Sequence, residues 1–285
     1  MNTILTTITD VRALPRPPAP ARRAVVMTMG ALHRGHLALV TAARDVVGPT
    51  GQVLVTIFVN PLQFGDQADL ETYPRTLTAD VDACREAGVD VVFAPNAGEM
   101  YPAGAPVTRV MAGATGDDLE GAARPGHFSG MLTVVLKLLN VTTPDVAFFG
   151  EKDYQQLTLI RQMVADFNIG VDIVGVPTCR EPDGLAMSSR NVRLTAADRP
   201  AALTLSRALS AGQAAAADGG DAAAVVTAAG AELTDIDVDY LDLRSVDLGP
   251  PTEAGPARLL VAANVAGVRL LDNCEVVLRA RGGHT

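Results

Sequence analysis

Apolar runs alternate with segments of helical periodicity through the first part of the chain. The runs are continuous in Val, Ile, Phe and Met rather than alternating, which is typical of strands buried on both faces of a parallel sheet. The apolar runs cover 24–29, 52–59, 89–94, 146–149 and 171–176, and helix-length segments lie between them at 36–47, 77–87, 130–140 and 153–167. This order predicts an α/β fold with a Rossmann-like, doubly wound parallel sheet.

The pattern changes near residue 195. Residues 195–198 are typical of a helix N-cap with acidic early residues, and an Ala-rich segment follows that residues 219–221 divide into two helices. Shorter strand candidates, separated by Gly and Pro, come next at 238–246, 258–265 and 269–271. This second pattern predicts a smaller α+β domain.

Two domains and an N-terminal lead-in therefore describe the expected organisation. The Rossmann-like domain is expected over 1–178 and the smaller domain over 179–285. The proline-rich residues 15–20 do not suit a helix interior, so we expect residues 1–23 to form a stiff surface lead-in.

Composition narrows the classes of function. The chain has 285 residues, of which 48% are hydrophobic and 19% charged, as in folded proteins. Its net charge of −9 argues against a nucleic-acid partner. Three scattered cysteines without a CxxC motif fit a reducing compartment, so we expect a cytoplasmic protein. A membrane span is not expected, because the chain has no apolar stretch of 18 residues, and a secretory signal is not expected, because no basic region followed by an apolar segment stands at the N-terminus.

Residues 28–36 hold the first candidate for chemistry. His33 and His36 stand three positions apart, where a strand-like run turns through glycine into a helical pattern. Bare backbone N–H groups and the helix dipole at such a turn suit a phosphate, and two imidazoles add ring donors. A solvated helix start also explains an isolated pair, whereas zinc requires a third ligand. The position at the end of the first strand favours an anion site.

Amides and charges follow two further strands. Asn60 and Gln63, after the second apolar run, either cap a turn or bind a small polyol or hydroxy acid. Gly150 is followed closely by Lys152 and Asp153. The Lys152 ammonium can bind phosphate oxygens, and the Asp153 carboxylate can accept hydrogen bonds from ribose hydroxyls or from helix N–H groups. An acidic helix start explains the aspartate but not the lysine, because a lysine opposes the dipole.

Two weaker motifs complete the set. Ser188, Ser189 and Arg190 follow a glycine in a polar loop, and two hydroxyls with a guanidinium suit a polyphosphate, although Ser-Ser-Arg is common in loops. Arg124 and His127 precede a predicted helix and are either anion-binding or structural.

Taken together and in this order, the four main segments resemble the pantothenate synthetase (pantoate–β-alanine ligase) family of the nucleotidyltransferase superfamily, whose signature is His-x-Gly-His. The resemblance covers 24–275, with further similarity at 73–76 and 271–273. It implies a homodimeric, AMP-forming carbon–nitrogen ligase of vitamin B5 and coenzyme A biosynthesis. Pantoate would attack the α-phosphate of ATP to give pantoyl adenylate and pyrophosphate, and β-alanine would then displace AMP.

The same resemblance implies a role for each matching residue. The catalytic residues would be His33, His36 and Lys152. ATP would be bound by Met29, His33, His36, Gly150, Lys152, Asp153, Cys179, Met187, Ser188, Ser189 and Arg190, and pantoate by Gln63, Gln156 and Asn60. Magnesium would be held mainly by the ATP phosphates, with few or no dedicated protein ligands. The smaller domain would act as a lid over the ATP and pantoate sites of the first.

Three positions depart from the family's pattern. Met27 stands where a proline is usual, and Arg34 stands where an acidic residue is usual. Ala79 and Asp80 stand where the family often has two aspartates, sometimes linked to magnesium.

Three other functions compete with this interpretation. A nucleotidyltransferase with a phosphorylated acceptor is disfavoured by Gln63, Gln156 and the Ser-Ser-Arg loop. A protein like an aminoacyl-tRNA synthetase is disfavoured by the short, acidic chain. A non-catalytic nucleotide sensor is disfavoured because His36, Lys152 and the glutamine pair are all present.

Overall fold

The computed structural model describes residues 2–65 and 67–280. The chain forms two compact units, one comprising Met1–Glu151 and Gln155–Pro177, the other Lys152–Tyr154 and Thr178–Thr285. The second unit therefore includes a short segment, 152–154, that the sequence analysis placed in the first domain. That the second unit is a lid stays a prediction.

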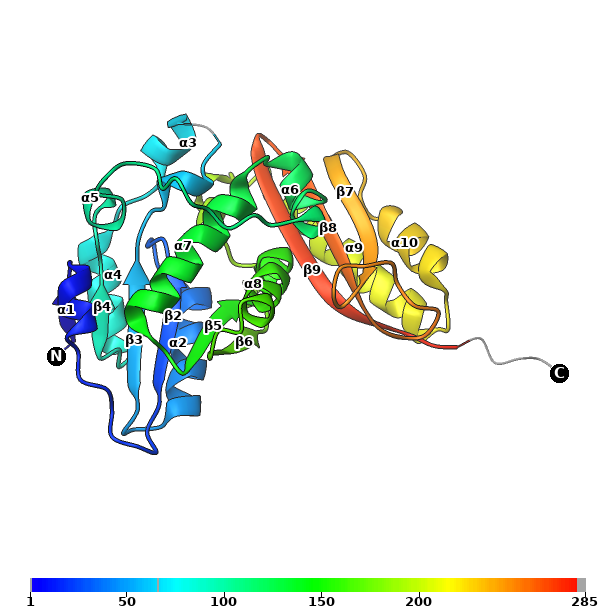
Figure 1. The fold of residues 1–285 in the computed structure, drawn as a ribbon. Helices are drawn as coiled ribbons and strands as arrows, with labels where there is room; N and C mark the ends of the chain where they lie inside the picture. Colours follow the sequence, from blue (N-terminus) through cyan, green and yellow to red (C-terminus); the bar gives the residue numbers. More distant parts are fainter. Residues whose placement is uncertain (1, 66, 281–285) are drawn as a thin grey trace. The chain divides into compact units, whose positions relative to one another are not determined.

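The first unit is built on a six-stranded sheet, and every pairing in it is parallel. The strand order is β1-β4-β3-β2-β5-β6, which is that of a doubly wound fold, so the predicted fold class is confirmed (Figure 1). The strands are β1 (Thr3–Leu5), β2 (Arg23–Thr28), β3 (Gln52–Ile57), β4 (Val91–Phe93), β5 (Val146–Gly150) and β6 (Asp172–Val176).

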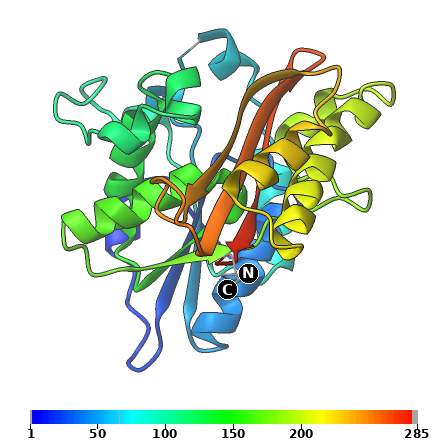
Figure 2. The ribbon, with the colours of Figure 1, turned by 90° about the vertical axis from the view of Figure 1, so that its right-hand side faces the viewer.

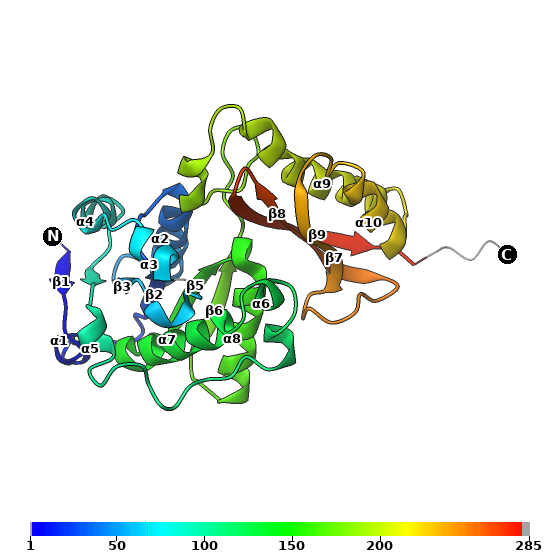
Figure 3. The same cartoon turned by 90° about the horizontal axis from the view of Figure 1, so that it is seen from above.

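Helices cover both faces of this sheet, as Figure 3 shows. Neighbouring residues of one strand point to opposite faces: Val26 packs with Leu39 of α2, whereas Val25 packs with Leu138 of α7. This double burial explains the continuous apolar runs. The helices are α1 (Ile8–Arg12), α2 (Arg34–Val47), α3 (Gln67–Thr72), α4 (Leu77–Glu86), α5 (Ala97–Met100), α6 (Glu120–Ala123), α7 (His127–Thr142) and α8 (Tyr154–Asp166).

The N-terminal segment differs from the prediction of a surface lead-in. Thr3–Leu5 forms β1 and pairs with β4, and Ile8–Arg12 forms α1. Thr7 caps this helix, because its side chain accepts a hydrogen bond from the Asp10 N–H over 3.1 Å. A strand of three residues is too short for its periodicity to show in sequence.

The second unit packs two helices on one face of a three-stranded antiparallel sheet (Figure 2). Its elements are α9 (Arg199–Ala217), α10 (Ala222–Gly230), β7 (Asp237–Ser245), β8 (Gly255–Val265) and β9 (Val268–Leu278). This confirms the smaller α+β pattern. No helix in the described part of the chain is long and apolar enough to cross a bilayer.

Two boundaries in this unit differ from the expectation. Strand β9 runs far beyond the predicted 269–271, because Ala266 and Gly267 form a two-residue hairpin turn with φ of 51° and 78° that pairs it along all of β8. Helix α9 begins at Arg199 rather than at 195, since the N–H and hydroxyl of Thr195 donate to the Asp198 carboxylate over 2.9 and 2.6 Å.

Candidate active site

His33 and His36 lie at the start of α2, and both rings cap the helix through Nδ1. The His33 Nδ1 accepts from the Gly35 N–H over 3.1 Å, and the His36 Nδ1 accepts from the His33 N–H over 3.2 Å. A neutral imidazole that accepts at one nitrogen carries its proton on the other, so both rings fit the Nε2–H tautomer. Their centroids are 4.1 Å apart. One helix start therefore presents two neighbouring ring N–H donors.

The main-chain N–H groups just before the helix are already hydrogen-bonded, so the prediction of bare N–H groups is wrong for residues 30–33. Their acceptors are the Thr28 hydroxyl for Gly30, the Asp80 carboxylate for Ala31 and Leu32, and His36 Nδ1 for His33. Sequence analysis missed the role of Asp80 because this residue lies in α4, which is remote in sequence. The main-chain N–H groups of residues 30–33 are therefore not available to a phosphate in this conformation.

The carboxyl ends of β2, β3 and β5 share one edge of the sheet, since β2 pairs in parallel with both of the others. Met29, Asn60 and Gly150 lie at or just beyond these strand ends. At Gly150 an added Cβ would meet no heavy atom within 4 Å, so the backbone is open there. The structure thus brings these three predicted site residues to one edge.

Asn60 is 1% exposed, and its amide is fully used inside the protein. Its Nδ2 donates to Gln63 Oε1 over 3.0 Å and to the Gly130 carbonyl over 3.2 Å. Its Oδ1 accepts from the Tyr101 hydroxyl over 2.8 Å and from the Leu62 N–H over 3.4 Å. Since two donors and two lone pairs are satisfied, Asn60 acts as a support for Gln63.

Gln63 is held from both its side chain and its main chain. Its Nε2 lies 3.2 Å from Met29 Sδ, so the two predicted residues are in contact. The Gln63 carbonyl lies 2.8 Å from His127 Nδ1, and His127 Nε2 lies 3.3 Å from the Arg124 guanidinium. The structure therefore favours the structural alternative for Arg124 and His127, which fix the chain at Gln63.

The two glutamines at the start of α8 differ in their surroundings. Gln155 is 4% exposed, accepts from the Glu120 N–H over 3.0 Å, and donates to the carbonyls of Thr115 and Asp118 over 2.7 and 2.9 Å. Gln156, the predicted pantoate ligand, is partly buried, and no side-chain hydrogen bond holds it among the described residues. Gln156 is thus the glutamine with donors and acceptors to offer.

Lys152 is positioned by the antiparallel sheet of the second unit. Its carbonyl accepts from Asn273 Nδ2 over 2.8 Å, and Asn273 Oδ1 accepts from Arg258 Nε over 2.6 Å. The Arg258 guanidinium also lies over the Tyr154 ring, 4.2 Å from its centroid. The Lys152 ammonium lies 3.6 Å from the Asp153 carboxylate. Sequence analysis assigned no role to Arg258.

The loop with the Ser-Ser-Arg motif ends in a 3₁₀ turn, η4 (Ser189–Arg193). Ser188 caps this turn, because its Oγ accepts from the Arg190 N–H over 3.2 Å. Upstream, the Met187 N–H donates to the Cys179 carbonyl over 2.9 Å, and their sulfurs are 3.6 Å apart. The structure therefore places the two sulfur residues against each other at the base of the loop.

Two partly buried polar contacts anchor this loop. Arg180 binds Asp272, which is 3% exposed, through two hydrogen bonds of 2.6 and 3.0 Å. Asn191 donates to Glu181 over 2.6 Å. Burial alone would raise the pKa of the Glu181 carboxyl, but hydrogen bonds from Asn191 and Arg199 lower it. The loop thus rests on a charged, ordered base.

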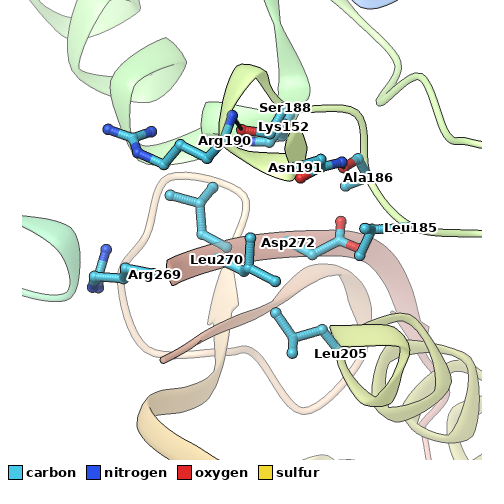
Figure 4. Close-up of a pocket in the computed structure, with 11 residues that line it drawn as sticks. Lys152, Leu185, Ala186, Ser188, Arg190, Asn191, Leu205, Arg269, Leu270 and Asp272 are labelled. Atoms are coloured by element: carbon cyan, nitrogen blue, oxygen red, sulfur yellow. Dashed lines mark hydrogen bonds between the residues drawn. The ribbon is translucent and has the colours of Figure 1, made fainter. Parts of the chain in front are cut away.

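Figure 4 shows a pocket in the second unit that joins several predicted residues. Lys152, Ser188 and Arg190 lie on one side of it, and Leu205 and Leu270 lie on the other. Asn191 also lines this pocket, and its Oδ1 is buried with no hydrogen-bond partner among the described residues. Arg269 and the Asp272 carboxylate line the pocket as well, so three cations, one anion and a hydroxyl meet there, a set that suits a polar ligand with negative charge.

The three departures from the family's pattern have separate explanations. Arg34 is exposed, and Met27 packs against the core on the α7 face of the sheet. The two Asp80 oxygens accept main-chain N–H groups. In residues 2–65 and 67–280, no three His, Cys, Asp or Glu side chains are grouped so that they could hold a metal ion.

The chain is similar to known proteins over nearly its whole length. The profile of the pantoate–β-alanine ligase family matches residues 3–275. A pantothenate synthetase of Salinispora arenicola is 60% identical over 89% of this chain and 90% of its own length. The crystal structure of pantothenate synthetase from Thermus thermophilus is 46% identical, with a TM-score of 0.88 over 95% of this chain and 98% of that one. A Francisella tularensis pantoate–β-alanine ligase, complexed with β,γ ATP and β-alanine, is 35% identical, with a TM-score of 0.79 over 96% and 97%.

Proposed function

Because the chain belongs to the pantoate–β-alanine ligase family, we propose that it condenses pantoate with β-alanine to pantothenate at the expense of ATP. A carboxylate does not react with an amine until its oxygen becomes part of a good leaving group. Attack of the pantoate carboxylate on the α-phosphate of ATP forms pantoyl adenylate and releases pyrophosphate. The β-alanine amine then attacks the acyl carbon, forms the amide bond and releases AMP.

The observation that carries this proposal is the pair of main-chain contacts at Nδ1 of His33 and His36, from which we infer the same tautomer for both rings. Both Nδ1 atoms accept backbone N–H groups, so both Nε2–H groups are donors for the phosphates. Fixed donors stabilise the charge that develops on the phosphate oxygens as the carboxylate attacks, because they need no reorganisation during the reaction. His33 and His36 therefore act as electrostatic residues, not as nucleophiles.

Lys152 and the Ser-Ser-Arg loop are proposed as further donors to the phosphates of ATP. Lys152 and Arg190 add positive charge, and the hydroxyls of Ser188 and Ser189 add neutral donors. Asp153 and the open backbone at Gly150 hold the ribose. Cys179, Met187 and the backbone of Met29 complete the nucleotide site.

Gln63 and Gln156 bind the hydroxyls and carboxylate of pantoate. Gln63 is oriented by Asn60 and Met29, which suits a residue that must hold the attacking carboxylate in line. The Gln156 amide can both donate hydrogen bonds to pantoate and accept them from it. Asn60 then acts by positioning Gln63.

Magnesium would be held through the ATP phosphates, and when bound it would offset their negative charge. Lys152 and Arg190, which line the pocket of the second unit, would add their positive charge to that of the ion. We further propose that the enzyme is a cytoplasmic homodimer.

A direct assay tests the reaction. Purified protein with ATP, Mg²⁺, pantoate and β-alanine should release AMP, and omission of either pantoate or β-alanine should abolish sustained release. Pantoate alone should support exchange of labelled pyrophosphate into ATP, because adenylation is reversible. Exchange with a phosphorylated acceptor such as phosphopantetheine, but not with pantoate, would overturn the proposal.

A further inference from the structure

The buried carboxylate of Asp80 accepts hydrogen bonds from the turn that precedes α2. Asp80 is 3% exposed and lies in the first turn of α4. Its Oδ1 accepts from the Leu32 N–H over 2.8 Å, and its Oδ2 accepts from the Ala31 N–H over 3.0 Å and from the Thr76 hydroxyl over 3.1 Å. Three neutral donors thus share a carboxylate that makes no ion pair within the described residues. Such hydrogen bonds are stronger than neutral ones.

The turn that Asp80 binds has a backbone that needs support. Ala31 has φ of 50°, in the left-handed region that residues with a Cβ rarely adopt. Gly30 precedes it with φ of 86°, and a Cβ added there would lie 3.0 Å from Asp80 Oδ2. The Asp80 carboxylate therefore packs directly against Gly30. Its hydrogen bond to the Ala31 N–H offsets the free-energy cost of the left-handed conformation at Ala31.

This turn leads straight into the histidine pair. Leu32, held by Asp80, is followed by His33, the N-cap residue of α2 with φ of −131° and ψ of 176°. The His33 N–H in turn donates to His36 Nδ1. A shift of the chain at residues 31 and 32 therefore moves the cap residue and weakens the contact that sets the tautomer of the second ring.

We propose that Asp80 is a positioning residue for the adenylation step, acting through the turn at 30–32 to aim His33 and His36. This inference rests on the proposed function. Asp80 does not touch the reacting atoms in this account. It keeps two Nε2–H donors in the place and tautomer that the phosphates require, and small misplacements of such groups slow reactions strongly.

The main test replaces the carboxylate by its isosteric amide. In Asp80→Asn, one oxygen still accepts, but the new NH₂ group faces a main-chain N–H. We expect pantoate-dependent pyrophosphate exchange to fall about tenfold or more, with the pantoate KM changed by less than about threefold. Asp82→Asn is the matched control, because Asp82 is exposed on the same helix, and it should leave exchange unchanged.

Histidine nitrogen spectra of ¹⁵N-labelled protein supply a readout that a merely structural role would not move. In the wild type, two of the histidines should show the Nε2–H pattern that His33→Asn and His36→Asn remove one at a time. In Asp80→Asn, these two signals should shift toward tautomer averaging, while the remaining histidine signals stay in place. A folded Asp80→Asn protein with wild-type exchange and unchanged spectra would overturn the inference.

A second variant keeps the test decisive if Asp80→Asn does not fold. Thr76→Val removes only the hydroxyl that orients the carboxylate and leaves both main-chain contacts. We then expect exchange to fall about two- to fivefold with broadened histidine signals, and unchanged rate and signals would count against the inference. If the wild type shows no pantoate-dependent exchange, the proposed function fails. The spectra of the variants then still decide whether Asp80 sets the histidine geometry.

Discussion

Asn273 donates a hydrogen bond from Nδ2 to the carbonyl of Lys152 over 2.8 Å, across 121 positions of sequence. Asn273 lies on β9 and is 3% exposed, and its Oδ1 receives the buried Arg258 guanidinium. The backbone of the cationic residue in the candidate phosphate site is therefore fixed by a strand of the second unit.

Asn273→Ala should impair both stability and catalysis. The change leaves the Lys152 carbonyl and the Arg258 guanidinium without this partner, and a buried polar group that loses its partner costs about 1–3 kcal/mol. We expect a loss of that size in urea unfolding, and a lower kcat for AMP release. Asn264→Ala, at an exposed position of β8, is the control. Equal behaviour of the two variants would contradict the positioning of Lys152 by Asn273.

His33→Asn and His36→Asn should separate helix capping from catalysis. Asparagine places Oδ1 where histidine places Nδ1, so the cap is kept, but the Nε2–H donor is lost. Unfolding free energies should stay within about 1 kcal/mol of wild type, while adenylate formation falls about 100-fold. His33→Ala and His36→Ala should lose both properties. Near-native turnover in either asparagine variant would show that the ring does not serve the phosphates.

Lys152→Met should abolish most of the charge stabilisation at the phosphates. Methionine keeps an unbranched side chain of similar reach, so its effect on folding should be small, while kcat/KM for ATP falls about 100-fold. Arg207→Met removes one positive charge from an exposed site on α9 and controls for net charge. If Lys152→Met were as active as Arg207→Met, the prediction that Lys152 binds the phosphates would be wrong.

The adjacent glutamines provide a matched pair of variants. Gln155→Ala should destabilise the protein by about 1–3 kcal/mol in urea, because the Glu120 N–H and two carbonyls lose their partner. Gln156→Ala should leave stability within about 0.5 kcal/mol but raise the KM for pantoate. Steady-state assays over a range of pantoate concentrations check this. If Gln155→Ala raised the KM for pantoate and Gln156→Ala lowered the stability, Gln155 rather than Gln156 would be the pantoate ligand.

Buried thiols should make the protein sensitive to alkali. Burial, and then the Asp80 charge, raises the pKa of Cys84 from 9.0 to about 11. Above pH 9 the unfolded thiol ionises while the folded one stays neutral, so this stability is present below pH 9 and is lost as pH rises toward 11. The slope is at most about 1.4 kcal/mol per pH unit for one thiol. Urea unfolding between pH 8 and 10.5 measures it, and Cys84→Ala should flatten the fall.

Local patterns in the sequence were enough to predict the parallel sheet and most helices of both units. The runs that became β2, β3, β5 and β6 were visible because strands buried on both faces contain few polar residues. The three-residue β1 was missed, and β9 was placed too short, since pairing partners rather than local periodicity define such strands. Glycine and charge patterns likewise marked the histidine turn, Lys152 and the Ser-Ser-Arg loop.

What the sequence determined by itself was the set of chemical groups and the strand ends that present them, because both are written in short-range patterns. The tertiary structure alone decided how those groups are held. Asp80 closes the turn before His33, Asn60 orients Gln63, and Asn273 fixes Lys152. Two of these contacts join residues far apart in the chain, and a hydrogen bond between remote segments leaves no trace in local periodicity. The tertiary structure also supplies hydrogen-bond acceptors to the N–H groups of residues 30–33, which the sequence analysis had expected to be bare.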